Sequence, residues 1–261
     1  MERWNGRIAL VTGATSGIGA SIAVKLAKKG MKVIGCGRRV ERIQELNKEL
    51  NLHIISYKCD LSNMSEVAKM FDWIQEEESI GHIDLCVCNA GYSGSDSLMK
   101  GSPESWTQMM NVNVISVSLA TQLSVKMFKE KNIKDGQVVY INSVYSHYHP
   151  DLANKSLHFY CATKMANKSL LEMWRREINE MEGSENIKIS AISPGLVETE
   201  FIPAMFNDKS AQERIAVQEM VKNTMTALAP EDVVNALLYI ISTPAHIAVH
   251  DVIVRPTGNT I

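Results

Sequence analysis

Short runs of apolar and β-branched residues alternate along the chain with longer stretches in which apolar residues recur at helical spacing. The short runs predict strands at 7–12, 31–36, 53–58, 83–88, 136–142, 187–193 and 250–254. The longer stretches predict helices at 17–29, 39–50, 63–77, 104–131, 157–182 and 230–242. This alternation is typical of β–α–β units, so we expect an α/β fold: a doubly wound parallel sheet of about seven strands with helices on both faces.

No linker or repeat interrupts the pattern, so we expect residues 1–261 to form a single domain. The run 83–88 is almost entirely apolar, as a strand covered on both faces requires. A formal net charge of −2 argues against binding to nucleic acid or to anionic membranes. The chain shows no signal-peptide pattern and no apolar stretch of membrane-spanning length, which predicts a cytoplasmic protein. Its five cysteines lack the spacing of a zinc or disulfide framework.

Two segments break the alternation, and both should lie at the carboxyl ends of strands, where such sheets bind ligands. One is a polar, aromatic loop at 143–156, and the other is a Met- and Phe-containing stretch at 196–226. His147 and His149 in the first segment could suggest a metal site, but no third ligand is near them, so we expect no metal. His147 could line the substrate pocket or bind a distal substrate oxygen, and it could equally be a solvated loop residue.

A glycine-rich loop follows the first predicted strand and opens the first predicted helix: Thr12-Gly13-Ala14-Thr15-Ser16-Gly17-Ile18-Gly19. Glycines allow the backbone to approach a pyrophosphate, and the helix amino end offers unpaired N–H groups. The loop could also be simple turn chemistry, but its position favours a Rossmann-type nucleotide site.

The end of the second strand indicates which dinucleotide binds. A carboxylate there would accept hydrogen bonds from the adenosine ribose and indicate NAD, whereas this chain has Gly37 followed by Arg38 and Arg39. Guanidinium groups pair well with a 2′-phosphate, which favours NADP(H). The alternative is that both arginines simply begin a surface helix. Asp60 and Asn89-Ala90-Gly91 end the third and fourth strands and should face the same crevice, although Asp60 could instead cap the next helix.

Tyr160 and Lys164 are spaced to lie on one helical face, one turn apart. A nearby ammonium group favours the phenolate, so we expect Lys164 to lower the pKa of Tyr160. Ser143 directly follows the fifth strand, so its hydroxyl should emerge at the carboxyl edge of the sheet.

With these motifs in this order, the sequence resembles the short-chain dehydrogenase/reductase family over essentially its whole length. The resemblance implies that Tyr160 is the acid–base, that Lys164 binds the nicotinamide ribose, that Ser143 holds the substrate oxygen and that Asn113 fixes a proton-relay water. Its neighbour Asn111 reads as an ordinary polar helix position. The resemblance assigns residues 7–143 mainly to nucleotide binding and 143–226 to catalysis and a substrate lid. The expected cofactor-binding residues are Gly13, Thr15, Ser16, Gly17, Ile18, Gly19, Arg38, Arg39, Asp60, Leu61, Asn89, Ala90, Gly91, Tyr160, Lys164, Pro194, Gly195, Val197 and Thr199.

The segments 1–7, 242–247 and 254–257 resemble insect farnesol dehydrogenases and a mammalian family member that reduces keto-steroids. We therefore expect an apolar alcohol as substrate, farnesol first, with keto-steroid or general carbonyl reduction as the alternative. A scaffold without turnover is disfavoured because the whole catalytic set is present. The expected substrate-contacting residues are Tyr145, His147, Leu196, Phe201, Met205 and Phe206. The family also implies a homodimer or homotetramer, but Arg255-Pro256-Thr257 replaces the common glycine pair near the carboxyl terminus, and the gap from Ser143 to Tyr160 is longer than usual.

Overall fold

The computed structural model describes residues 1–149, 155–184, 186–205, 210, 212–213, 215–216, 219 and 226–258. Its strands are β1 (Ile8–Thr12), β2 (Lys32–Gly37), β3 (Ile55–Lys58), β4 (Leu85–Cys88), β5 (Gln137–Ile141), β6 (Lys188–Pro194) and β7 (Asp251–Val254). They form one parallel sheet in the order β3-β2-β1-β4-β5-β6-β7. The predicted α/β fold with a doubly wound parallel sheet is confirmed. Every observed strand lies inside its predicted range except β2 and β6, which each extend one residue further.

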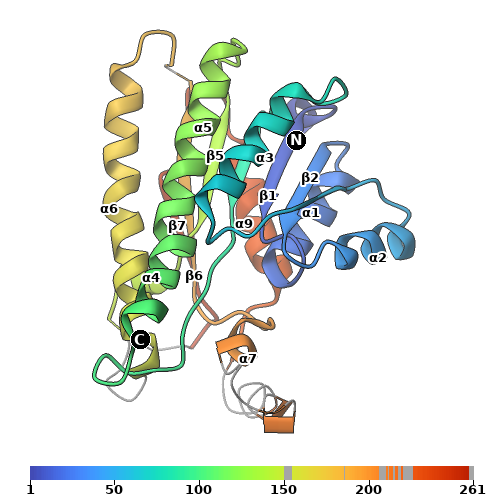
Figure 1. Cartoon of the computed structure of the whole chain (residues 1–261). Helices are drawn as coiled ribbons and strands as arrows, with labels where there is room; N and C mark the ends of the chain where they lie inside the picture. The colour runs from blue at the N-terminus through green and yellow to red at the C-terminus, as the bar shows by residue number, and fades with distance from the viewer. Residues whose placement is uncertain are drawn as a thin grey trace.

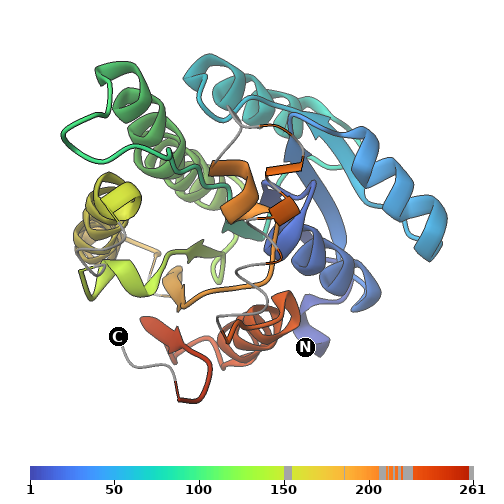
Figure 2. The same cartoon turned by 90° about the horizontal axis from the view of Figure 1, so that it is seen from below.

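Helices cover both faces of this sheet (Figures 1 and 2). They are α1 (Gly17–Lys28), α2 (Glu41–Leu50), α3 (Met64–Glu76), α4 (Pro103–Met110), α5 (Ser116–Glu130), α6 (His158–Glu180), α7 (Phe201–Met205) and α9 (Pro230–Ser242), with single 3-10 turns at Glu2–Trp4, Val144–Ser146 and Lys155–Leu157. One apolar core joins the sheet to α3, α5 and α6, and a second joins its other face to α1, α2 and α9. No helix in the described part of the chain is both long and apolar enough to cross a bilayer.

The predicted helix at 104–131 is interrupted. Residues Asn111–Ile115 form a π-helical turn between α4 and α5, so Asn111 opens an irregular turn and is not the ordinary helix position expected. A π turn carries one more residue than an α turn and displaces side chains locally, and such turns are frequent at functional sites. Sequence periodicity could not reveal it, because one inserted residue barely changes the apolar pattern.

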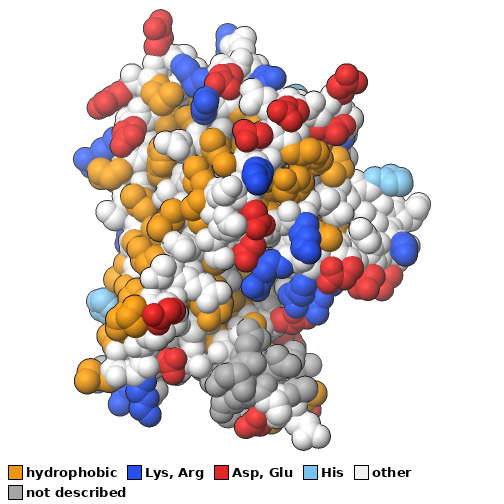
Figure 3. All heavy atoms as spheres, viewed as in Figure 1, with side chains coloured by type: hydrophobic (Ala, Val, Ile, Leu, Met, Phe, Trp, Pro, Cys, Tyr) orange, Lys and Arg blue, Asp and Glu red, His pale blue; other side chains and the backbone are white. Residues whose placement is uncertain are grey.

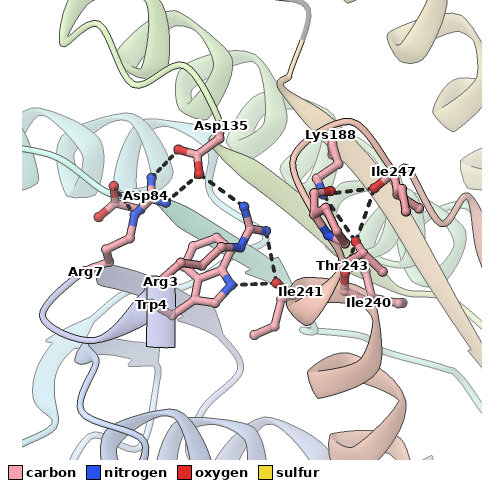
Figure 4. Close-up of polar contacts among 11 residues, drawn as sticks. Arg3, Trp4, Arg7, Asp84, Asp135, Lys188, Ile240, Ile241, Thr243 and Ile247 are labelled. Atoms are coloured by element: carbon pink, nitrogen blue, oxygen red, sulfur yellow. Dashed lines mark hydrogen bonds and ion pairs between the residues drawn. The ribbon is translucent and has the colours of Figure 1, made fainter. Parts of the chain in front are cut away.

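A polar cluster connects the amino ends of the central strands, whereas the predicted site lies at their carboxyl ends (Figure 4). Trp4 is fully buried and its indole Nε1 donates to the Ile241 carbonyl at 2.6 Å. Arg7 pairs with Asp84 at 2.9 Å and with Asp135 at 2.7 Å. These contacts tie the start of β1 to the segments that precede β4 and β5 and to the end of α9.

Candidate functional site

The glycine loop between β1 and α1 forms a cradle from which side chains are sterically excluded. Gly13 has φ +67°, and a Cβ there would lie 3.0 Å from Ala90 Cα. A Cβ on Gly19 would lie 2.3 Å from both Asn89 Nδ2 and the Gly13 carbonyl oxygen. The first turn of α1 contains no acidic residue, so its free N–H groups and positive dipole end are available to an anion. The cradle therefore fits a dinucleotide pyrophosphate.

Asn89 and Thr12 fix the shape of this cradle. Asn89 Nδ2 donates to the Thr12 carbonyl at 2.8 Å, while the backbone N–H groups of Asn89 and Ala90 donate to Thr12 Oγ1 at 3.0 and 3.1 Å. The side chain of Asn89 is thus engaged with the loop, and the hydroxyl of Thr12, which was not among the expected site residues, joins β1 to the end of β4. Gly91 follows at the same edge.

Basic side chains gather beside the end of β2, between α2 and α7 (Figure 3). Arg39 Nη2 donates to Ser16 Oγ at 3.2 Å, which brings two expected cofactor-binding residues together. Arg39 and Arg42 both pair with Glu200, at 3.4 and 2.7 Å. Burial opposes the ionisation of Glu200, but the hydrogen bond and charge of Arg42, with help from Arg39, lower the pKa of its carboxyl group below the ordinary value. Arg38 forms none of the ion pairs found among the described residues.

Asp60 and Leu61 continue the site beyond β3. Asp60 Oδ1 accepts hydrogen bonds from the backbone N–H and the hydroxyl of Ser62, which lower the pKa of its carboxyl group. The alternative that Asp60 caps the following helix is wrong, because the side chain of Asn63 accepts from Ser65 N and caps α3. The Leu61 side chain is buried in the core, which leaves its backbone as the part that can face a nucleotide.

Tyr160, Ser143 and Lys164 converge at the carboxyl end of β5. Tyr160 is buried, and a hydrogen bond connects its side chain with Ser143. Lys164 Nζ lies 5.5 Å from the centroid of the Tyr160 ring and donates to the Ile141 carbonyl at 2.9 Å. The ring of Phe201 packs against Tyr160, with centroids 5.5 Å apart. The structure therefore brings three of the four predicted catalytic side chains into one buried site.

The expectation that Lys164 lowers the pKa of Tyr160 is wrong for the cofactor-free protein. Burial raises the pKa of the Tyr160 phenol well above its usual range, and the hydrogen bond from Ser143 offsets only part of this effect. Burial also lowers the pKa of Lys164 to about 8. In a buried site each group disfavours its charged form, and burial is the largest influence on both pKa values.

Asn113 lies in the π turn and is fully buried. Its side chain bonds Tyr92 through both amide atoms at 2.8 Å, and its Nδ2 also donates to Thr163 Oγ1 at 3.0 Å. The backbone carbonyl of Asn113 accepts a hydrogen bond from Asn167 Nδ2 at 2.7 Å. Asn113 thus ties the loop after β4 to α6, the helix that carries Tyr160 and Lys164.

The segment after β6 runs across the carboxyl edge of the sheet. Pro194 ends β6, and the backbone N–H of Gly195 donates to the Val254 carbonyl at the end of β7. Leu228 donates its N–H to the Leu196 carbonyl and forms a β-bridge with Val197. Thr199 contacts the glycine loop at Gly17. Ile18, in the first turn of α1, packs on the second core. In α7, Phe201 is half-buried and Met205 is buried. Phe206 lies outside the described residues.

His147 is bound into a polar cluster on the α6 side of β6 and β7. Its Nε2 lies 3.0 Å from Asp251 Oδ2 and 3.2 Å from Ser193 Oγ, while Nδ1 lies 3.0 Å from Lys168 Nζ. Because an ammonium group can only donate, Nδ1 accepts and Nε2 carries the proton toward Asp251. The solvated-loop interpretation is therefore wrong, since the ring is anchored. Tyr145, two residues earlier, is half-buried and close enough to Tyr160 to influence its pKa.

Sequence reasoning missed several residues that hold these groups in place. They are Thr12, Arg42, Asn167, Glu200 and Asp251. Only Arg42 had a usable signal, because it lies one turn beyond Arg38 and Arg39 on a predicted helix. The others are ordinary polar residues whose partners are remote in the sequence. Among the described residues, no three His, Cys, Asp or Glu side chains are grouped as metal ligands would be.

Comparison with known proteins agrees with this geometry. The family model for the short chain dehydrogenases matches residues 7–210. Dehydrogenase/reductase SDR family member 11 from Mus musculus is 42% identical over 98% of this chain and 96% of its own length. A farnesol dehydrogenase from Aedes aegypti is 34% identical, with 99% of both chains covered.

A solved structure of a serine dehydrogenase in its closed form, complexed with NADP+, superposes with a TM-score of 0.85 at 28% identity, over 97% of this chain and 96% of the other. The chain therefore belongs to the short-chain dehydrogenase family.

Proposed function

We propose that this chain is an NADP(H)-dependent oxidoreductase that interconverts a lipophilic alcohol and its aldehyde or ketone, with a farnesol-type terpenoid alcohol as the favoured substrate. The observation that carries the proposal is the buried group formed by Tyr160, Ser143 and Lys164 beside the glycine cradle. A single acid–base tyrosine, held by a serine hydroxyl, is the equipment needed to move a substrate hydroxyl proton.

A bound NADP(H) supplies hydride exchange at its nicotinamide ring. In alcohol oxidation, Tyr160 accepts the hydroxyl proton as the substrate carbon gives up its hydride, and in reduction Tyr160 returns that proton to the oxygen. Ser143 holds the substrate oxygen next to the tyrosine. The ammonium group of Lys164 stabilises the developing phenolate and binds the nicotinamide ribose. Asn113 and Asn167 fix α6, so the tyrosine and lysine keep their positions.

The preference for NADP(H) is supported by Arg38 and Arg39 at the end of β2, where the sequence has no acidic residue. The complex of the related serine dehydrogenase with NADP+ points the same way. Replacing Arg38 with aspartate should weaken NADPH binding at least tenfold while NADH binding changes little, because a phosphate contact becomes a repulsion. Equal losses for both cofactors would argue against the phosphate role.

A lipophilic substrate is supported by the apolar groups that border Tyr160. Phe201 packs on the tyrosine ring, and Met205 and Leu196 lie in the same segment. The flexible methionine side chain adapts to irregular apolar shapes, and the phenylalanine ring adds apolar surface, which together suit a terpenoid alcohol. The name of the Aedes aegypti relative supports farnesol as the first substrate to test.

The decisive experiment measures NADPH formation from farnesol and NADP+ by the wild-type protein and by Tyr160→Phe. The variant should lose at least about 1,000-fold in turnover, since general acid–base catalysis contributes on this scale, while its NADPH affinity stays within about twofold. Tyr239→Phe, at an exposed position of α9, is the matched control and should retain full activity. Comparable turnover by Tyr160→Phe would refute the acid–base assignment.

The identity of 42% to the Mus musculus dehydrogenase/reductase, against 34% to the farnesol dehydrogenase, supports a second candidate: NADPH-dependent reduction of carbonyl compounds, with keto-steroids as the class to test. The same apolar surface and the same proton donor would serve this reaction. Catalytic efficiency for farnesol oxidation and for reduction of a 17-keto-steroid, measured on one preparation, separates the two candidates.

A further inference from the structure

Glu200 lies between two arginines at the edge of the nucleotide cradle. Arg42 Nη1 donates to both carboxylate oxygens of Glu200, at 2.9 and 2.7 Å, and Arg39 Nη1 approaches Oε2 at 3.4 Å. The second terminal nitrogen of Arg39 donates to Ser16 Oγ in the glycine loop, at 3.2 Å. The guanidinium group of Arg39 therefore connects the Glu200 carboxylate with the hydroxyl of Ser16, another expected cofactor-binding residue.

These ion pairs fasten the segment 196–205 to α2. Thr199, next to Glu200, packs so closely on the glycine loop that a Cβ added to Gly17 would lie 3.0 Å from Thr199 Cγ2. Beyond Glu200, α7 places Phe201 against Tyr160. Viewed from below, α7 lies across the carboxyl ends of the central strands (Figure 2). Glu200 therefore links Arg39, one of the two arginines expected to bind the cofactor, to the segment that packs on the catalytic tyrosine.

A carboxylate and a phosphate compete for the same guanidinium geometry. Arginine donates paired N–H groups to either anion, so the guanidinium group that binds the Glu200 carboxylate could instead bind a phosphate. A 2′-phosphate held by Ser16 and Arg39 would meet the negative charge of Glu200 on the other side of the same guanidinium group. The two anions repel at this distance, and Arg39 cannot serve both equally well.

We propose that Glu200 is a specificity-determining residue that occupies the arginine cluster as an internal anion in the free protein and is displaced from Arg39 by the 2′-phosphate of NADP(H). This inference rests on the proposed preference for NADP(H). It makes the Glu200–Arg39 contact a latch: this contact holds the segment 196–205 to the turn before α2 until a 2′-phosphate arrives, and it weakens NADPH binding because it must first be broken, whereas the pair with Arg42 is kept. Cofactors without a 2′-phosphate leave the latch in place.

The size of the effect follows from exposure. The side chains of Arg39 and Glu200 are 46% and 50% exposed, so solvent screens their attraction. Exposed ion pairs of this kind contribute little, which corresponds to an effect of about two- to fivefold on a binding constant. A latch of this strength can be released by a phosphate dianion, and its effect remains measurable.

The test compares the dissociation constants of NADPH and NADH, from the fluorescence of the reduced nicotinamide, for the wild-type protein, Glu200→Gln and Glu45→Gln. Glu45 is an exposed acid on α2 that takes part in none of the ion pairs of the described residues, so its variant controls for net charge. Glu200→Gln should bind NADPH about two- to fivefold more tightly and NADH unchanged, and Glu45→Gln should match the wild type. An unchanged or weaker NADPH affinity in Glu200→Gln, or equal tightening for both cofactors, would overturn the proposal.

A second readout needs no nicotinamide. Adenosine 2′,5′-diphosphate should increase amide hydrogen exchange in residues 196–205 of the wild-type protein, whereas ADP, which lacks the 2′-phosphate, should not. In cofactor-free Glu200→Gln, exchange in this segment should already be faster than in the wild type, and Glu45→Gln should not differ. Identical exchange in all three proteins would refute the latch.

The outcomes also separate the latch from the proposed function. If the wild-type protein binds NADPH no more tightly than NADH, the cofactor preference and the latch both fail. If it prefers NADPH and Glu200→Gln changes neither affinity nor exchange, only the latch fails.

Discussion

Replacing Lys164 with methionine should abolish turnover and yet relieve an electrostatic cost in the cofactor-free protein. The ammonium group is buried, and burial lowers its pKa from 10.5 to about 8. Each pKa unit corresponds to about 1.4 kcal/mol, so keeping this lysine charged in the folded protein costs about 3 kcal/mol near neutral pH. Methionine removes this cost but leaves the Ile141 carbonyl without the hydrogen bond from Nζ, a loss of about 1–3 kcal/mol.

The pH dependence separates these two contributions. The pKa of Lys164 is lower in the folded than in the unfolded protein, so the unfolded chain binds more protons between about pH 8 and 10.5. The stability of the wild-type protein therefore rises with pH across this window, relative to a variant without the amine. From pH 7 to pH 10, the difference in unfolding free energy between the wild type and Lys164→Met should shift by about 2.5 kcal/mol in favour of the wild type. The lost hydrogen bond contributes equally at every pH.

Urea unfolding of the cofactor-free proteins, followed by tryptophan fluorescence at several pH values between 7 and 10, measures this difference. Lys28→Met, at an exposed position of α1, is the control and should follow the wild-type profile, because its ammonium group is in water in both states. Parallel stability curves for the wild type and Lys164→Met across this range would refute the reasoning that burial sets the protonation of Lys164.

Three further predictions concern the groups that support the site. Asp84→Ala should lower the unfolding free energy by about 1–3 kcal/mol, because it leaves the Ile8 N–H without its acceptor and removes one of the two carboxylates that Arg7 binds, while Asp135 remains; a loss below about 0.5 kcal/mol in urea titration would contradict this. Lys188→Met should cost about 2 kcal/mol, because Nζ donates to carbonyls in the turn after α9 (Figure 4), and an unchanged melting temperature would contradict it. His147→Phe should lower kcat about tenfold with little effect on NADPH affinity, because the ring anchors the turn that follows Ser143. An unaltered kcat would show that this anchor does not position the serine.

The sequence by itself determined the order and type of the elements. Apolar runs of strand length and amphipathic stretches of helix length are local signals, and their alternation leaves few topologies other than a doubly wound parallel sheet. The chemical groups of the site were equally accessible, because Tyr160 and Lys164 are neighbours on one helix and the glycine loop is continuous in sequence. Side chains that directly follow parallel strands must meet at one edge of the sheet, which places Ser143 near them without any tertiary calculation.

Tertiary structure alone decided which side chains meet across long separations and which charges are buried. Glu200 reaches arginines more than 150 positions earlier in the chain, and Asn167 bonds the Asn113 carbonyl, contacts that no spacing rule encodes. Burial also reversed the expected effect on Tyr160: its spacing from Lys164 predicted a lower pKa, but the removal of water raises it. Sequence spacing shows that Lys164 and Tyr160 are neighbours. Whether the pKa of the tyrosine rises or falls depends on how far burial removes the pair from water.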